Sequence, residues 1–98
     1  MLSGTDSAAE REVTGGYSGD LLSWVMGRAR AGDAWVTIMS NVSVAAVALL
    51  TDVACVVLAE GVKPDEALLS RAVREDLPLL CSGLSAFELC ARISKALE

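Results

Sequence analysis

The sequence predicts a small α/β domain with three layers, in which a mainly parallel sheet carries helices on its faces. Two apolar runs rich in β-branched residues, 34–39 and 53–59, have the length and composition of strands covered on both sides. A polar corner and a helix-like stretch follow each of them. Strand–helix units in succession imply right-handed crossovers and therefore parallel strands. Ninety-eight residues fit one domain, so we expect a single domain over residues 1–98.

Composition narrows the classes of function. The apolar content is 53%, which is enough for one core, and the net charge is −5 with scattered basic residues. A nucleic-acid binder would show clustered basic residues, so no nucleic-acid partner is expected. The chain contains no His, the commonest general base and transition-metal ligand. We expect no catalytic residue, no metal and no cofactor.

Cysteines and hydropathy point to the cytoplasm. Cys55, Cys81 and Cys90 are odd in number and form no CxxC pair, so the spacing indicates neither a disulfide framework nor a zinc site. Residues 42–59 approach the length of a membrane span, but Asp52 would lie near its middle. The N-terminus has no secretory signal pattern. We therefore expect a cytoplasmic protein without a membrane segment.

The first third of the chain contains one helix. Residues 1–9 show no periodicity and are expected to form a loose arm, whereas 10–17 contain paired glycines that suit either a connecting turn or a ligand loop. Ser18 is the expected N-cap of a helix over 20–30. Trp24 lies off the apolar stripe of this helix, which predicts a contact with another chain. The stripe consists of Leu21, Leu22, Val25, Met26 and Ala29.

Three further helices follow the predicted strands. Ser40 or Asn41 caps a helix over 42–51 that has almost no polar face, so the sheet and either a neighbouring helix or a second subunit must cover it. Pro64 begins a helix over 65–76, and a short strand at 79–81 follows it. The inner face of that helix is expected to be Leu68, Leu69, Ala72 and Val73. Ser85 and Glu88 form a capping box, which starts a last helix over 86–97.

Small polar corners mark a candidate binding site. In an open parallel sheet the ligand crevice lies beyond the carboxyl ends of the strands, where backbone N–H groups at helix N-termini can hold an anion. We predict that a small anionic metabolite or nucleotide binds there. Helix caps and turns require the same residue types, so a purely structural role is the alternative. The corner residues are Ser40, Asn41, Glu60, Gly61 and Ser82.

The paired-glycine segment is expected to complete this site. Arg11 would supply a planar cation, Gly15 and Gly16 would let backbone N–H groups approach the ligand, and Asn41 would orient it. With the hydroxyl of Thr14, these residues are predicted to form one pocket with the carboxyl-end corners. The alternative is that Arg11 pairs with a carboxylate such as Glu60 and holds the loop down.

The segment Arg11-Glu12-Val13-Thr14-Gly15-Gly16 closely resembles the signature of the DRTGG domain family, with Glu10 where the family name has Asp. The resemblance continues through 19–23, 32–38, 60–65 and 84–88. It implies a fold similar to the N-terminal domain of HPr kinase and a regulatory, non-catalytic module. Such domains occur alone, in phosphotransacetylases and beside CBS domains. Similar stand-alone members are encoded near iron-only hydrogenase subunits in anaerobic bacteria.

The family's usual first strand is reduced here to residues 1–4, so either a misplaced start codon or a partner subunit that completes the sheet edge is expected. Two readings of function stay open. One is a regulatory module that binds a small anion. The other is a docking subunit whose surface engages a partner enzyme such as a hydrogenase-associated protein. Trp24 and the apolar helix over 42–51 also predict a homodimer.

Overall fold

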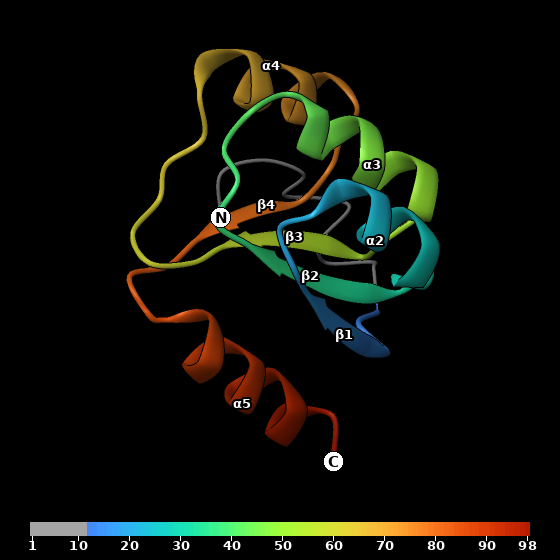
Figure 1. Ribbon diagram of the computed structural model, residues 1–98, viewed down its shortest axis with the longest axis vertical. Helices are drawn as coiled ribbons and strands as arrows, with labels where there is room; N and C mark the ends of the chain where they lie inside the picture. The colour runs from blue at the N-terminus through green and yellow to red at the C-terminus, as the bar shows by residue number, and fades with distance from the viewer. Residues whose placement is uncertain (1–11) are drawn as a thin grey trace.

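The computed structural model describes residues 12–98, and in it four strands alternate with four helices (Figure 1). Arg11 and the arm over 1–9 lie outside the described residues. Helices are present after each of the four strands, as an α/β sequence pattern predicts. In chain order the elements are β1 (Gly15–Ser18), α2 (Leu22–Arg28), β2 (Asp33–Thr37), α3 (Ser43–Thr51), β3 (Cys55–Leu58), α4 (Glu66–Arg74), β4 (Leu79–Cys81) and α5 (Ala86–Ala96).

The sheet is parallel throughout, and its strands lie in the order β1-β2-β3-β4. Each crossover joins neighbouring strands, and because crossovers are right-handed, all three crossover helices fall on one face. Figure 1 shows α2, α3 and α4 on that face and α5 on the other. The predicted three-layer α/β architecture is therefore confirmed.

The strands predicted at 34–39, 53–59 and 79–81 are present, but the sheet has a fourth strand that the sequence reading missed. Gly15–Ser18 is an edge strand, not a turn or ligand loop, and it pairs with β2 in a register that sets Gly15 opposite Asp33. Two glycines and a serine have low strand propensity, so pairing with β2 holds this segment extended.

Helix α2 is shorter than predicted, because Ser18 belongs to β1 and does not cap it. The helix runs from Leu22 to Arg28. Its N-cap is Leu21, whose side chain makes no capping hydrogen bond. Val25 is buried, and Leu22 and Ala29 pack against the core, whereas Leu21 and Met26 are more than half exposed. The predicted apolar stripe is thus correct for Leu22, Val25 and Ala29 and wrong for Leu21 and Met26.

The main core lies between the sheet and the layer formed by α2, α3 and α4. Trp35 is completely buried there, and its indole Nε1 donates a hydrogen bond to the carbonyl oxygen of Gly19 at 3.0 Å. Four residues of α3 are buried, and α2 and α4 pack on either side of it. Neighbouring helices therefore provide the cover that an apolar α3 requires. Within α3, Leu50 is the one large apolar side chain that is exposed, at 72%.

A smaller core lies under α5, where Leu89 packs against Val36, Val57 and Ala59 of the opposite sheet face. Helix α4 buries Leu68 and Ala72 as predicted, but Val73 is 59% exposed, because it lies on the outer side of that helix. Among residues 12–98, no helix is both long enough and apolar enough to cross a membrane.

Candidate functional site

The predicted site residues fall at opposite ends of the sheet. Thr14, Gly15 and Gly16 lie beside Gly32 and Asp33 at the amino ends of β1 and β2. The corner residues at 40–41, 60–61 and 82 follow the carboxyl ends of β2, β3 and β4. Thr14, Gly15 and Gly16 therefore do not share one pocket with these corners, because they begin a strand parallel to β2 and the corners follow the opposite ends of the strands.

At the amino end, the glycines let two strands start side by side. Thr14 donates its backbone N–H to the carbonyl of Gly32 at 2.9 Å. A β-carbon on Gly15 would lie 2.6 Å from Oδ1 of Asp33, and one on Gly32, whose φ is +87°, would collide with the Thr14 hydroxyl. These glycines do allow a close approach, but the approach is to residues of the same chain.

Asp33 is buried and is used by the turn before β2. Its Oδ2 accepts a hydrogen bond from the backbone N–H of Arg30 at 2.8 Å. The main chain of Asp33 accepts a bond from Ala54 at 2.8 Å, which ties the start of β2 to β3. Segments 14–16 and 32–33, which both lie in stretches that resemble the DRTGG family, thus form one structural unit at this end.

At the carboxyl end, the backbone donors of the Glu60–Gly61 corner are already engaged. The N–H of Glu60 donates to the carbonyl of Leu84 and that of Gly61 to the carbonyl of Ser82, both at 2.8 Å. Both corner residues have positive φ, 61° for Glu60 and 75° for Gly61. The turn therefore directs its N–H groups to the loop after β4, where they are not available to an anion.

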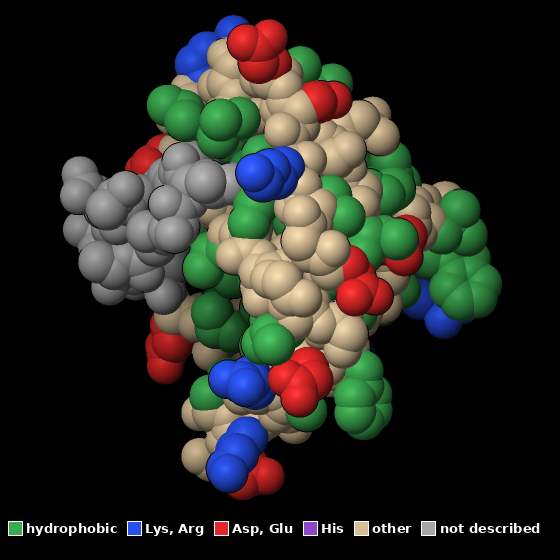
Figure 2. Space-filling view, turned by 90° about the vertical axis from the view of Figure 1, so that its left-hand side faces the viewer, with side chains coloured by type: hydrophobic (Ala, Val, Ile, Leu, Met, Phe, Trp, Pro, Cys, Tyr) green, Lys and Arg blue, Asp and Glu red, His purple; other side chains and the backbone are tan. Residues whose placement is uncertain are grey.

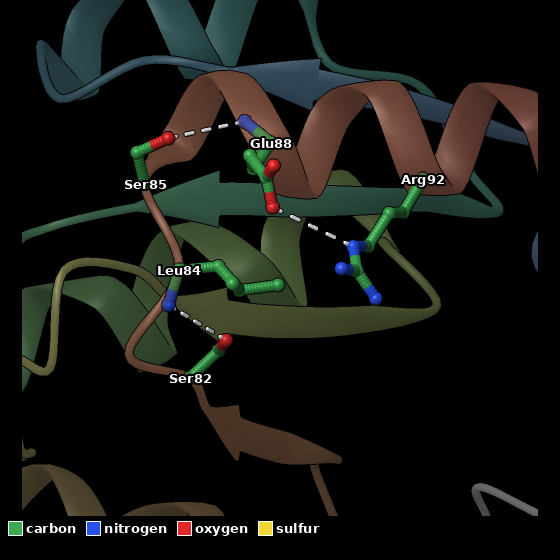
Figure 3. A network of polar contacts seen from close by, with 5 residues as sticks. All are labelled: Ser82, Leu84, Ser85, Glu88 and Arg92. Atoms are coloured by element: carbon green, nitrogen blue, oxygen red, sulfur yellow. Dashed lines mark hydrogen bonds and ion pairs between the residues drawn. The ribbon is translucent and has the colours of Figure 1, made fainter.

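The other corner residues are engaged in local contacts of the chain. Oδ1 of Asn41 accepts from the N–H of Ser43 at 3.0 Å, and the carbonyl of Ser40 accepts from the N–H of Asp65 at 3.0 Å. Figure 3 shows the start of α5, where Oγ of Ser82 accepts from Leu84 at 3.1 Å and Oγ of Ser85 accepts from Glu88 at 3.2 Å. Ser85 is the N-cap of α5, whereas Val42, which has no side-chain cap, is the N-cap of α3, where Ser40 or Asn41 was expected. The structural alternative for these residues is well supported by their contacts.

One polar contact was not anticipated from the sequence. Oδ1 of Asp20 accepts from the hydroxyl of buried Thr37 at 2.7 Å and from the N–H of Ile38 at 3.0 Å. The bond satisfies a hydroxyl in the core and ties the loop before α2 to the end of β2. A buried Thr in an apolar strand was the available clue, but nothing local pointed to its partner.

The described residues offer little that would activate a nucleophile. Cys81 is exposed at the end of β4, and partial desolvation raises the pKa of its thiol, while the nearby cation Lys63 lowers it to a smaller extent. A raised pKa disfavours the reactive thiolate at neutral pH.

On the face at the carboxyl ends of the strands, basic, acidic and hydrophobic side chains are interspersed (Figure 2).

Three cavities along residues 12–98 were compared with the predicted site, and the carboxyl-end corners line none of these three. The largest of the three, of about 460 Å³, lies at the amino end between Thr14–Tyr17 and the segment Arg28–Ala31. A second, of about 240 Å³, lies beside it against Gly32 and Asp52. The third, of about 270 Å³, is an apolar groove between α5 and β1–β2. Of the predicted site residues that the structure describes, Thr14, Gly15 and Gly16 line one or more of these three cavities and the others do not.

The outer surface of α2 carries an aromatic side chain exposed to solvent. Trp24 is 53% exposed, and the guanidinium carbon of Arg28 lies 4.0 Å from its ring centroid. Leu21, one turn earlier, is 58% exposed. Trp and Arg are enriched where proteins contact one another, and an exposed Trp held by an Arg is already ordered for such a contact.

Comparison with known proteins gives one match. The family model described as the DRTGG domain matches residues 13–96, nearly the whole chain, including both segments that meet at the amino end of the sheet. The resemblance found in the sequence is confirmed. No curated protein and no solved structure matches the chain.

Proposed function

The chain belongs to the DRTGG domain family, and from that premise we propose that it is a non-catalytic regulatory module that acts through contact with another protein chain. DRTGG domains are generally regulatory modules. The observation that carries the contact is the exposed Trp24–Arg28 pair on α2. A large ring left on the surface of a small domain favours a protein contact over a core role.

A role without catalysis is supported by the chemistry of the side chains. The sequence contains no His, so Ser and Cys side chains lack the usual general base. Oγ of Ser82 and Oδ1 of Asn41 already accept backbone hydrogen bonds, and the thiol of Cys81 has a raised pKa. The free thiols of Cys81 and Cys90 also agree with the proposed cytoplasmic location.

We propose self-association as the first form of this contact, in a homodimer. Because α2 and α4 flank α3, the support for a dimer comes from α2 and no longer from the apolar α3. A partner enzyme, such as the hydrogenase-associated proteins that the family resemblance suggests, is the second form. Both forms use the same exposed surface.

A small anionic ligand is the second candidate function, and one observation favours it. The 460 Å³ cavity at the amino end is lined by the backbone of Gly15 and Gly16 together with Arg28 and Arg30. Binding at the carboxyl-end corners, as first expected, has weaker support because the donors there are engaged. Thermal-shift measurements with nucleotides and acyl phosphates test this candidate, since a ligand at 100 times its Kd stabilises by about 2.7 kcal/mol.

Site-specific cross-linking tests the proposed contact. A photo-reactive residue at Ser23, exposed on α2 next to Trp24, should form adducts with a defined protein chain in the cell of origin. The same residue at Ala91, exposed on α5, is the control and should form none. Equal labelling from both positions, or none from Ser23, would contradict a contact through α2.

A further inference from the structure

We propose that the partner seated on α2 is a second copy of this chain, related by a two-fold axis that passes near Trp24, with the two α2 helices antiparallel. This inference rests on the proposed function and specifies it. Helix α2 lies on the outer side of the helix layer, on the opposite side of the sheet from α5 (Figure 1). Its outer surface is therefore open to another molecule without rearrangement of the sheet.

Opposite charges flank Trp24: Asp20 lies in the loop before α2, where its Oδ1 accepts from Thr37 and Ile38, and Arg28 lies at the end of α2, over the Trp24 ring. Asp20 and Arg28 lie four positions before and four positions after Trp24, and both are exposed. In an antiparallel arrangement centred on Trp24, Asp20 of one copy faces the partner's Arg28, and Arg28 faces the partner's Asp20. A two-fold contact repeats every pair, so one complementary pair provides two attractions. Trp24 then meets its own counterpart at the centre, where aromatic contacts contribute most.

Gly27 supports the same arrangement. It lies inside α2 on an exposed position, and a β-carbon there would meet nothing within 4 Å. Glycine inside a helix is less favourable than alanine, and no neighbour among residues 12–98 requires it here. In the two-fold arrangement Gly27 faces the partner's Leu21, which is 58% exposed. The missing side chain leaves room for that leucine and for close approach of the helices.

A helix of seven residues provides a small interface, so the dimer should be weak and concentration dependent. Weak binding makes the charge pairs a large share of the specificity. The test is therefore a charge exchange between two variants, Arg28→Glu and Asp20→Lys. Alone, each variant places like charges opposite one another twice. Mixed, they place opposite charges at both positions.

Sedimentation equilibrium on the purified chains should show that each variant alone dimerises at least about tenfold more weakly than the wild type. The mixture should form a heterodimer with an affinity within about threefold of the wild type. Lys95→Glu on α5 makes the same charge change away from the contact and should dimerise like the wild type. If either variant alone dimerises normally, or if the mixture gains nothing, the two-fold arrangement is wrong.

Asp20→Lys also removes the acceptor of the Thr37 hydroxyl, so a second pair protects the test against a folding defect. Asp20→Asn retains an oxygen at that position and loses only the charge. Mixed with Arg28→Glu, it should form more heterodimer than either variant forms homodimer. A wild-type chain that stays monomeric refutes this inference, whereas cross-links from Ser23 to a different protein would leave the proposed function standing.

Discussion

For the segment Thr14–Gly16, the predicted close approach of the backbone is correct, but the predicted partner of that approach is wrong. Glycines at 15 and 16 predict a close backbone approach, and the structure has one, between Gly15 and the carboxylate of Asp33. Sequence reasoning assigned that approach to a ligand, because the residue opposite Gly15 is 18 positions away and no local pattern links them. For single residues, the close approach could be predicted from the glycines, but the residue approached depended on the register of β1 and β2.

Substitution of the two glycines separates these roles. Gly15→Ala should lower the free energy of unfolding by roughly 1–3 kcal/mol, because its methyl group would overlap Oδ1 of Asp33. Gly16→Ala should change it by less than about 0.5 kcal/mol, since a methyl group there meets only ordinary contacts at 3.7 Å. Urea unfolding measures both. Equal effects, or a larger effect at Gly16, would show that the packing at the amino end has been misread.

At the scale of elements, the sequence predicted α5 from its cap and α4 from Pro64, and it missed β1, whose residues have low strand propensity. Ser85 and Asp65 start α5 and α4, and each accepts a hydrogen bond from the third residue of its helix. The start of α5 was predicted from Ser85 and that of α4 from Pro64, because each of these residues is next to its helix in the sequence. β1 was not, because Gly-Gly-Tyr-Ser is extended only by its pairing with β2. Asn41 and Ser82 were ambiguous for a related reason, since caps and anion sites use the same side chains.

Asn41 offers a direct test of the capping role. Asn41→Ala should destabilise the domain by about 1 kcal/mol, because the N–H of Ser43 loses its acceptor. Asn41→Asp should retain nearly full stability, since Asp caps helices as well as Asn does. Chemical denaturation of the three proteins makes the comparison. A neutral Asn41→Ala would mean that this contact contributes nothing to folding and would reopen a role in binding.

At the scale of the whole molecule, the strand order decides where a site can be. The rule that places ligands at carboxyl ends applies where the strand order reverses and leaves a crevice. Here the order β1-β2-β3-β4 never reverses, and the loops at that edge bind one another. The fold class followed from the alternation of strands and helices, whereas strand order depended on long-range pairing that no stretch of sequence specified. What the assembled domain exposes instead is the outer surface of α2.

The most direct test of that conclusion is the mass of the purified chain in solution, measured by light scattering over a range of concentrations. For the wild type, the mass should rise with concentration from 10.2 kDa towards twice that value. Phe87→Ala removes an aromatic ring that is 83% exposed on α5 and should behave like the wild type, whereas Trp24→Ala should stay at the monomer mass. A mass that stays at 10.2 kDa for the wild type, or that rises equally for Trp24→Ala, would contradict self-association through α2.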